Sequence, residues 1–338
     1  MAGRPAAQRA TAAGRTADVT LDDYLDEWFA LQRTRLEPTS WHNYRTMTRI
    51  YLQPALGATP LTDLTTRQLD LHYVRLLEDG GRTGGPLARR TVAYAHAILH
   101  KALGDAVAAG LLETNPADRA EVPRVDPRFD DAPRRLRTWV AEQGASFVRH
   151  PQVRELHDLW RVALGTGMRR GELLGLRWED LDLDVPQLRV AAALTSAGGQ
   201  LRLKGTKTRR VRTLHLDPDT AEVLARQPRR APAPYPLVFT RSDGRPWRPE
   251  VVTDRWRRQW PGLKLPFITL HGTRHTHASL LLQAGVPIKV VSERLGHSKV
   301  AMTLDVYAHV LPAADRAAAE VIGALVRTDP PPPPQPIG

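Results

Sequence analysis

The side chains best suited to chemistry lie near the end of the chain. Two imidazoles, a guanidinium and a phenol fall within residues 271–307, namely His271, His297, Arg274 and Tyr307, and Arg169 adds a second guanidinium. Guanidinium groups present forked donors that match phosphate oxygens. Imidazoles move protons near neutral pH, and a phenol attacks phosphorus once cations or a base activate it. The set predicts cutting and rejoining of a nucleic acid without a metal ion.

Each of these residues also has an ordinary structural interpretation. Tyr307 could be a packing residue, and Arg169 could form a plain ion pair with Glu172, one helical turn later. Two features favour chemistry. Arg169 and Arg274 have apolar neighbours in the sequence, where a charge needs a partner or a function. Tyr307 follows the segment 295–297, Leu-Gly-His, at a spacing that can return the phenol to the imidazole. We then expect Glu172 to fix the Arg169 rotamer.

A metal site is the competing interpretation of the histidines. His271 and His275 are spaced i,i+4, as in helical zinc sites, and His277 is close by. However, Gly272 stands where such a motif carries a glutamate, and the chain has no cysteine. We therefore expect no metal and no cofactor, and we assign His271 to proton transfer or to hydrogen bonding with a phosphate.

The charge of the chain predicts a polyanionic partner, because 338 residues carry a formal net charge of +12. Basic residues are densest between Leu201 and His215, a segment without an acid. A solvated hairpin is the ordinary interpretation, but in so basic a chain we predict contact with the DNA backbone. The residues expected to bind DNA are Arg202, Lys204, Arg209, Arg210 and Arg212, and Lys207 completes the cluster.

A membrane is not an expected partner. No apolar run approaches the ~20 residues that span a bilayer, and residues 1–17 lack the apolar core of a secretion signal. Because the chain also has no cysteine, we expect a cytoplasmic location.

The pattern of elements predicts a first, helical domain at residues 19–115, after a disordered segment at 1–18. Thr20 and Asp23 look like a capping pair. Gly110 is expected to stop the last helix. The predicted helices begin at Thr20, run from about Thr39 to before Pro54, from Thr66 to Leu77, and from Arg90 to Ala109.

A linker at 116–133, rich in Pro, Asp and Arg, should precede a second domain at 134–327, and the Pro-rich tail at 328–338 should be disordered. In the second domain a helix at 156–176 holds Arg169. The predicted strands are 187–194, 200–204 and 210–216, and further helices begin at Pro218, Pro249, about Thr273, Pro287 and Ala313. The fold class is mostly α with a small antiparallel β-sheet.

Three motifs resemble those of the tyrosine recombinases of the phage-integrase type. They are the segment 166–172, Thr-Gly-Met-Arg-Arg-Gly-Glu, the segment 270–275, Leu-His-Gly-Thr-Arg-His, and Leu-Gly-His at 295–297 with Tyr307 ten residues later. The resemblance covers nearly everything from Val19 to Leu311. It implies a helical core-binding (SAM-like) DNA-binding domain followed by an α+β catalytic domain.

The resemblance also implies a role for each site residue. Tyr307 would attack a DNA phosphodiester to give a 3′-phosphotyrosyl link. Arg169 and Arg274 would clamp the phosphate, with Glu172 in support. The other catalytic residues would be His271 and His297, as base and hydrogen-bond donor, and Lys207, as general acid. Lys204 stays open as the acid, because Gly-Thr-Lys-Thr at 205–208 replaces the Pro-Lys-Thr that the family often shows.

By the same resemblance the partners are double-stranded DNA attachment sites, bound by a homotetramer that spans two sites and exchanges strands through a Holliday junction. Integration or excision of a mobile element is the expected role. An excisionase or a host DNA-bending factor would be the accessory partner.

Three alternatives stay open. A type IB topoisomerase uses the same chemistry, although the helical first domain and the spacing from Leu-Gly-His to Tyr307 favour a recombinase. A chromosome-resolving recombinase of the Xer kind is poorly separated by sequence. A non-catalytic DNA-binding protein on the same fold is disfavoured by the intact set of catalytic residue types.

Overall fold

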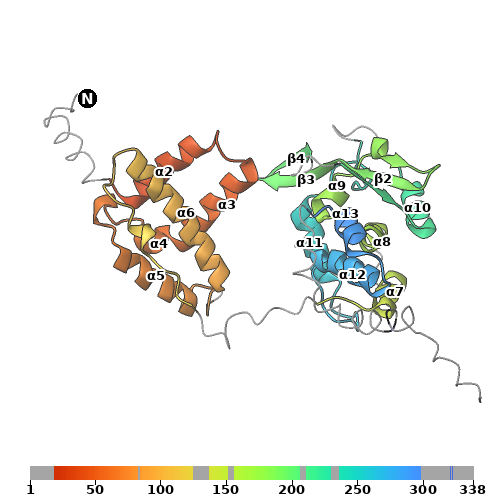
Figure 1. Ribbon diagram of the computed structural model, residues 1–338. Helices are drawn as coiled ribbons and strands as arrows, with labels where there is room; N and C mark the ends of the chain where they lie inside the picture. Colours follow the sequence, from red (N-terminus) through yellow and green to blue (C-terminus); the bar gives the residue numbers. More distant parts are fainter. Residues whose placement is uncertain are drawn as a thin grey trace, which may run out of the picture. The chain divides into compact units, whose positions relative to one another are not determined.

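The computed structural model forms two compact units (Figure 1). The first comprises residues 1–135 with 197–200, and the second comprises residues 136–196 and 201–338. Both units are largely helical, and small antiparallel sheets lie in the second, which confirms the predicted fold class. None of the described helices is long and apolar enough to cross a bilayer. The structure describes residues 19–82, 84–124, 137–150, 156–205, 211–229, 236–297, 320 and 322.

The first unit begins with α2 (Leu21–Gln32), whose start is fixed by the predicted capping pair. The Thr20 side chain accepts a hydrogen bond from the Asp23 amide at 3.2 Å, and Asp23 accepts one from the Thr20 amide at 3.1 Å. The remaining elements are α3 (Pro38–Tyr51), α4 (Gln53–Leu56), η1 (Leu61–Asp63), α5 (Thr66–Asp79), α6 (Arg89–Ala108) and η2 (Pro116–Asp118).

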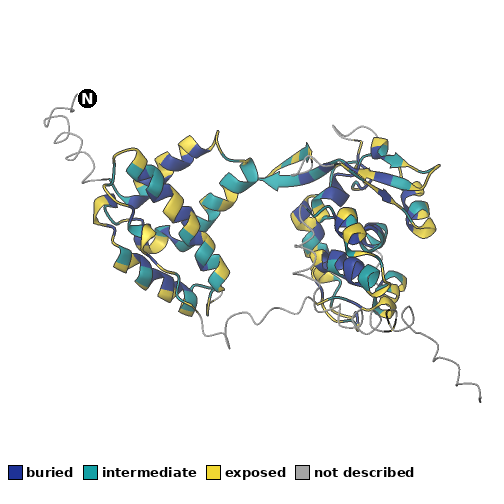
Figure 2. Cartoon of the chain, viewed as in Figure 1, coloured by how far each residue is buried: buried dark blue, intermediate teal, exposed yellow. Residues whose placement is uncertain are grey.

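The core of this unit is built from α2, α5 and α6 together with the segment 52–64, and hydrogen bonds join α2 to α6. The Tyr24 hydroxyl donates to the carbonyl oxygen of Ala102 at 2.5 Å, and the Trp28 indole donates to Asp105 at 2.8 Å. The helix α6 ends as predicted, because Gly110 takes a left-handed φ of 75°. Figure 2 shows the buried residues on the inward sides of the helices of each unit.

Residues 116–124, predicted as the start of a linker, pack against the first unit. Ala117 and Ala120 are buried in its core. The Arg89 side chain of α6 donates to the Pro123 carbonyl oxygen at 3.0 Å. The helical unit therefore continues past residue 115.

The second unit contains eight labelled helical segments and five strands among the described residues. The helices are α7 (Ala141–Arg149), α8 (His157–Thr166), α9 (Arg170–Leu174), η3 (Trp178–Asp180), α10 (Pro218–Ala225), α11 (Pro249–Arg258), α12 (Leu270–Gln283) and α13 (Ile288–Leu295). The strands are β1 (Leu181–Asp182), β2 (Gln187–Val190), β3 (Ala192–Ala197), β4 (Gln200–Gly205) and β5 (Arg212–His215). The helix α7 was not predicted from the sequence.

The strands form two antiparallel sheets, β1-β2-β5 and the hairpin β3-β4. In the first sheet Leu188 pairs with Leu214 and Val190 pairs with Arg212. Leu188, Val190 and Leu214 are buried, so this face of the sheet covers the helical core. The predicted strand 187–194 was wrong in one respect: it divides at Ala191 into β2 and β3, which belong to different sheets.

The predicted single helix at 156–176 was also wrong. The helix α8 ends at Thr166, where Gly167 takes a left-handed φ of 64°, and Arg169 is the N-cap residue of the separate helix α9. A Cβ atom on Gly167 would lie 2.7 Å from Cδ2 of His277. The left-handed glycine ends α8, and close packing against α12 leaves no room for a side chain at this position.

The core of the second unit contains Trp256, which is fully buried. It donates to the Ile268 carbonyl oxygen at 2.8 Å and lies edge-on to Trp160 at 5.0 Å between ring centroids. Trp247 and Trp260 are partly buried against the same core. The predicted terminal segments 1–18 and 328–338 lie outside the described residues. Of the helix expected from Ala313, only Glu320 and Ile322 are described, and both are helical.

Candidate active site

The candidate site begins at the break between α8 and α9, where Arg169 and Glu172 contact each other twice. The Arg169 amide donates to Oε2 of Glu172 at 2.9 Å, and Nη1 of Arg169 donates to Oε1 at 2.9 Å. Glu172 is 5% exposed, whereas the Arg169 side chain is 40% exposed. The buried carboxylate therefore orients a guanidinium that solvent or a ligand can still reach.

A second arginine binds the same carboxylate from β5. Nη1 and Nη2 of Arg212 donate to the two oxygens of Glu172 at 3.1 and 2.7 Å. Burial raises the pKa of Glu172, but the hydrogen bonds and charge of Arg212, followed by those of Arg169, outweigh burial and lower the pKa to about 2. Glu172 is therefore ionised at neutral pH.

Arg274 reaches the site from α12 and is only 2% exposed. Its Nη1 donates to the Gly167 carbonyl oxygen at 2.8 Å, and its Nη2 donates to the Leu295 carbonyl oxygen at 2.6 Å. The buried charge is thus held by backbone oxygens at the ends of two helices, where carbonyl groups lack helical partners.

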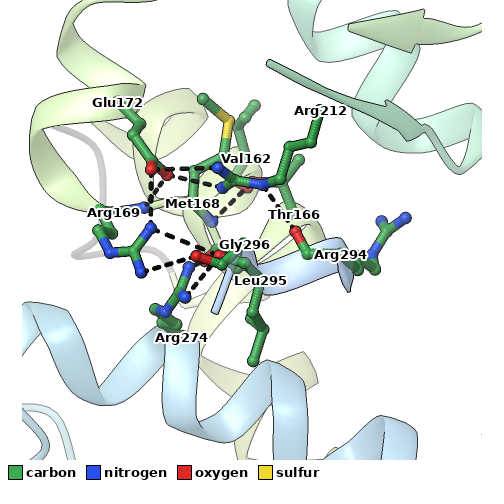
Figure 3. Close-up of polar contacts among 11 residues, drawn as sticks. Val162, Thr166, Met168, Arg169, Glu172, Arg212, Arg274, Arg294, Leu295 and Gly296 are labelled. Atoms are coloured by element: carbon green, nitrogen blue, oxygen red, sulfur yellow. Dashed lines mark hydrogen bonds and ion pairs between the residues drawn. The ribbon is translucent and has the colours of Figure 1, made fainter. Parts of the chain in front are cut away.

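The C-terminus of α13 is the point on which the three arginines converge (Figure 3). Arg212 donates to the carbonyl oxygen of Arg294 at 2.8 Å, and Arg169 donates to that of Gly296 at 3.2 Å. Gly296 takes a left-handed φ of 66°, and the next amide, of His297, donates back to Ser292 at 3.0 Å. This is the Schellman ending of a helix. It turns the carbonyls toward the arginines and places His297 directly after them.

The histidines of the site are held in the neutral form. Burial, with the charges of Arg274 and Arg169, lowers the pKa of His271, and burial with the same two charges lowers that of His297 to about 4. His271 and His275 lie edge to face, with 4.8 Å between their ring centroids. His271 keeps an exposed face, whereas His275 is half-buried. Neutral imidazoles can accept a proton, which suits them to act as bases.

His277 and Arg294 form a further hydrogen-bonded pair at the end of α13. His277 is buried, and its Nδ1 lies 2.8 Å from the Leu164 carbonyl oxygen, while Nε of Arg294 donates to its Nε2 at 3.1 Å. Arg294 also donates to the carbonyl oxygens of His215 and Gly165. Arg294 was not predicted as a site residue, because a basic residue in the last turn of a helix gives no signal of such contacts.

The structure brings together Arg169, Glu172, Arg274 and the start of the His297 segment, as the motifs suggested. Arg202, predicted to bind DNA, is exposed on β4, and Lys204 is half-buried there. Four other predicted residues lie outside the described residues: Lys207, Arg209, Arg210 and Tyr307.

Arg212 was predicted to contact DNA, but its side chain is 12% exposed and bound to Glu172. The sequence held a signal for this arrangement. Arg212 lies two residues before the buried Leu214, and alternate residues of a strand face the same side.

Two family models match the chain. The phage integrase family matches residues 137–313, and the phage integrase N-terminal SAM-like domain matches residues 20–73. The chain belongs to the phage integrase family. It is accordingly an enzyme of the tyrosine recombinase class, a site-specific recombinase that acts on DNA, and none of the three alternatives is favoured.

Relatives and solved structures agree with this membership. A XerC-like tyrosine recombinase from Caldanaerobacter subterraneus subsp. tengcongensis is 25% identical over 91% of this chain and 84% of that protein. The Tn1549 transposon integrase in complex with transposon right end DNA superposes with a TM-score of 0.73 at 23% identity, over 90% of this chain and 99% of that one. A lambda integrase tetramer bound to a Holliday junction gives a TM-score of 0.63 at 18% identity, over 88% and 83% of the two chains. These structures share the fold of the recombinase described here.

Proposed function

We propose that this recombinase cuts and rejoins double-stranded DNA at attachment sites through a 3′-phosphotyrosyl intermediate, with Tyr307 as the nucleophile. One observation carries the proposal. Arg169 and Arg274, 105 residues apart in the sequence, donate to adjacent carbonyl groups at the end of α13, and His297 follows them directly. Tyr307 lies ten residues further along the chain.

The two arginines act as the phosphate clamp. In the transfer step negative charge grows on the non-bridging oxygens of phosphorus, and fixed guanidinium donors stabilise it more than they stabilise the ground state. Arg274 is held by Gly167 and Leu295, and Arg169 is held by Glu172. Because both are oriented before DNA arrives, little reorganisation is needed during the reaction.

One of the two imidazoles accepts the proton of the Tyr307 phenol. His271 or His297 accepts it as the oxygen of Tyr307 attacks phosphorus, and the other donates a hydrogen bond to the phosphate. The lowered pKa of both histidines keeps the rings neutral at pH 7, so each has a nitrogen that can accept a proton, but it also makes each ring a weak base. The negative charge of an incoming phosphate would raise their pKa and favour proton uptake at that moment.

The general acid is Lys207, or Lys204 on β4. As the bond from the tyrosine oxygen to phosphorus forms, the bond from phosphorus to the 5′ oxygen breaks, and the lysine protonates that oxygen. The phosphotyrosyl link keeps the energy of the broken bond, so religation by another 5′ hydroxyl needs neither ATP nor a metal ion.

Assembly follows from the need to exchange strands between two sites. We propose a homotetramer that acts through a Holliday junction, supported by the fold shared with the lambda integrase tetramer bound to such a junction. A role in moving a mobile element is supported by the likeness to a transposon integrase. An excisionase or a host DNA-bending factor would set the direction, and the DNA substrate implies a cytoplasmic location.

A nicked DNA substrate tests the central claim, because the short downstream fragment that carries the free 5′ hydroxyl diffuses away and can no longer attack the phosphotyrosyl link. Wild-type protein should form an adduct that survives denaturation, and Tyr307→Phe should form none while DNA binding in a gel-shift titration stays nearly unchanged. Tyr235→Phe is the matched control and should form the adduct normally. An adduct formed by Tyr307→Phe, or lost in Tyr235→Phe, would overturn the assignment of the nucleophile.

A further inference from the structure

The Arg212 side chain donates three hydrogen bonds to described residues, and each of the three goes to a group of the candidate site. Two go to the oxygens of Glu172 and one, from Nε, goes to the carbonyl oxygen of Arg294 at 2.8 Å. The side chain extends from the same face of β5 as the buried Leu214 and is 12% exposed. The position of the Arg212 side chain is thus determined by its contacts with Glu172 and Arg294 inside the second unit.

The carboxylate of Glu172 is shared evenly between two arginines. Oε1 accepts from Nη1 of Arg169 and Nη1 of Arg212, and Oε2 accepts from the Arg169 amide and Nη2 of Arg212. Four donors surround a carboxylate that is 5% exposed. Removal of Arg212 would leave each oxygen with one donor and would free the carboxylate to rotate about Arg169.

Arg212 also lies against the turn that precedes His297. A Cβ atom on Gly296 would come within 2.9 Å of Nη1 and 3.1 Å of Cζ of Arg212. The guanidinium therefore lies directly against the Schellman glycine, while its Nε donates to the carbonyl oxygen of Arg294, two residues earlier. One side chain fixes both the carboxylate that orients Arg169 and the end of the helix that Arg169 contacts.

We propose that Arg212 is a positioning residue for DNA cleavage, which sets the orientation of the Arg169 guanidinium through Glu172 and the C-terminus of α13. The inference rests on the proposed role of Arg169 as a phosphate clamp. It replaces the expectation that Arg212 contacts the DNA backbone. It also connects β5, the strand that follows the basic hairpin segment, to the clamp.

The test measures single-turnover cleavage of the nicked substrate at saturating protein, with DNA affinity measured separately. Arg212→Gln should slow cleavage on the order of 10²-fold, the scale that misplacement of a catalytic group produces, with little change in Kd. Arg212→Lys keeps the charge but not the fork, so it should recover part of the rate. Arg189→Gln is the matched control: it removes an exposed arginine from the neighbouring strand β2 and should cleave normally.

The double variant Arg212→Gln/Glu172→Gln separates positioning from simple stabilisation. In Arg212→Gln the buried negative charge of Glu172 loses two hydrogen-bond donors. The double variant removes that charge, so its melting temperature should be higher than that of Arg212→Gln. Its cleavage rate should stay as low as that of Glu172→Gln, because both changes interrupt one chain of contacts. Recovery of cleavage together with stability would overturn the proposal. The proposal would also be overturned if the rate losses of Arg212→Gln and Glu172→Gln multiplied in the double variant, or if Arg212→Gln bound DNA with a higher Kd. Either result would indicate that Arg212 contacts DNA independently of Glu172.

The pH profile gives a second readout. With Arg212 in place Glu172 is ionised far below neutral pH. In Arg212→Gln burial should raise the pKa of Glu172. As the pH is lowered, the cleavage rate of this variant should therefore begin to fall at a higher pH than that of the wild type. The double variant has no carboxylate at position 172 and should not show this acidic fall in rate. Arg169→Gln is run in parallel. If it cleaves normally, the clamp itself is wrong; if it fails to cleave while Arg212→Gln is unaffected, only the role of Arg212 is wrong.

Discussion

Arg274 donates a hydrogen bond of 2.6 Å to the carbonyl oxygen of Leu295, and it thereby joins the middle of α12 to the end of α13. The guanidinium is 2% exposed, and its other terminal nitrogen is bound to Gly167 at the end of α8. Three helices thus meet at one buried side chain. Both halves of the guanidinium fork are needed for this arrangement, which makes the site sensitive to a change that preserves the charge.

Arg274→Lys should slow formation of the covalent adduct on the order of 10²-fold, the usual scale for loss of an oriented donor at a reacting centre. One ammonium group does not reproduce the two directed bonds to Gly167 and Leu295. The adduct rate is measured on the nicked substrate in a single turnover. Arg189→Lys, on the exposed side of β2, is the control. Equal rates for the two variants would rule out the clamp role of Arg274.

Gly296→Ala should destabilise the protein and slow cleavage, whereas Gly285→Ala should only destabilise it. Both glycines end a helix with positive φ, 66° and 79°, so each alanine costs about 1–2 kcal/mol of left-handed strain. A Cβ atom on Gly296 would also meet Arg212 at 2.9 Å, but one on Gly285 meets nothing within 4 Å. Thermal unfolding and adduct formation are measured for both variants. Identical cleavage in the two would show that the contact between Gly296 and Arg212 does not affect the site.

His277 should make the free energy of unfolding depend on pH between about 4 and 6.5. Burial, then the charge of Arg294, lowers its pKa from 6.5 to about 4. A depressed histidine pKa means that the unfolded chain binds a proton first as the pH falls, so the stabilisation is complete above pH 6.5 and is lost toward pH 4.

Urea unfolding of wild type and His277→Gln between pH 4 and 8 checks this dependence. Gln removes the titration, so the slope of stability against pH should decrease by up to roughly 1.4 kcal/mol per pH unit. His271 and His275 remain in both proteins and cancel in the difference. Parallel pH curves for the two proteins would contradict the lowered pKa of His277.

Cleavage should persist in EDTA. The guanidinium groups of Arg169 and Arg274 can supply the charge stabilisation that a divalent cation gives other phosphoryl-transfer enzymes. Within the described residues there is no group of three or more His, Asp or Glu side chains that could hold a metal ion. The adduct rate is compared before and after chelation. A loss that Zn²⁺ restores would point to a metal bound by His271 and His275.

Much of this protein could be predicted from residues that act locally. The pair Thr20 and Asp23 caps α2 because the bonds span one turn, and Gly110 ends α6 because only its own φ must be positive. The chemical types of Arg169, Arg274, His271 and His297 are likewise visible in the sequence, since forked donors and imidazoles have the same properties wherever they lie.

Only the tertiary structure decided which groups meet. The helix predicted at 156–176 ends before Gly167, whose positive φ is a local feature, but only the fold shows that His277, 110 residues later, packs against that glycine. The contact of Arg212 with Glu172, across 40 residues, depends on the pairing of β5 with β2. The convergence of Arg212, Arg274 and Arg169 on three successive carbonyl groups depends on the Schellman turn at Gly296 and on the packing of α12 against it. Such contacts lie between segments distant in sequence, and their geometry is set by packing, which no local pattern records.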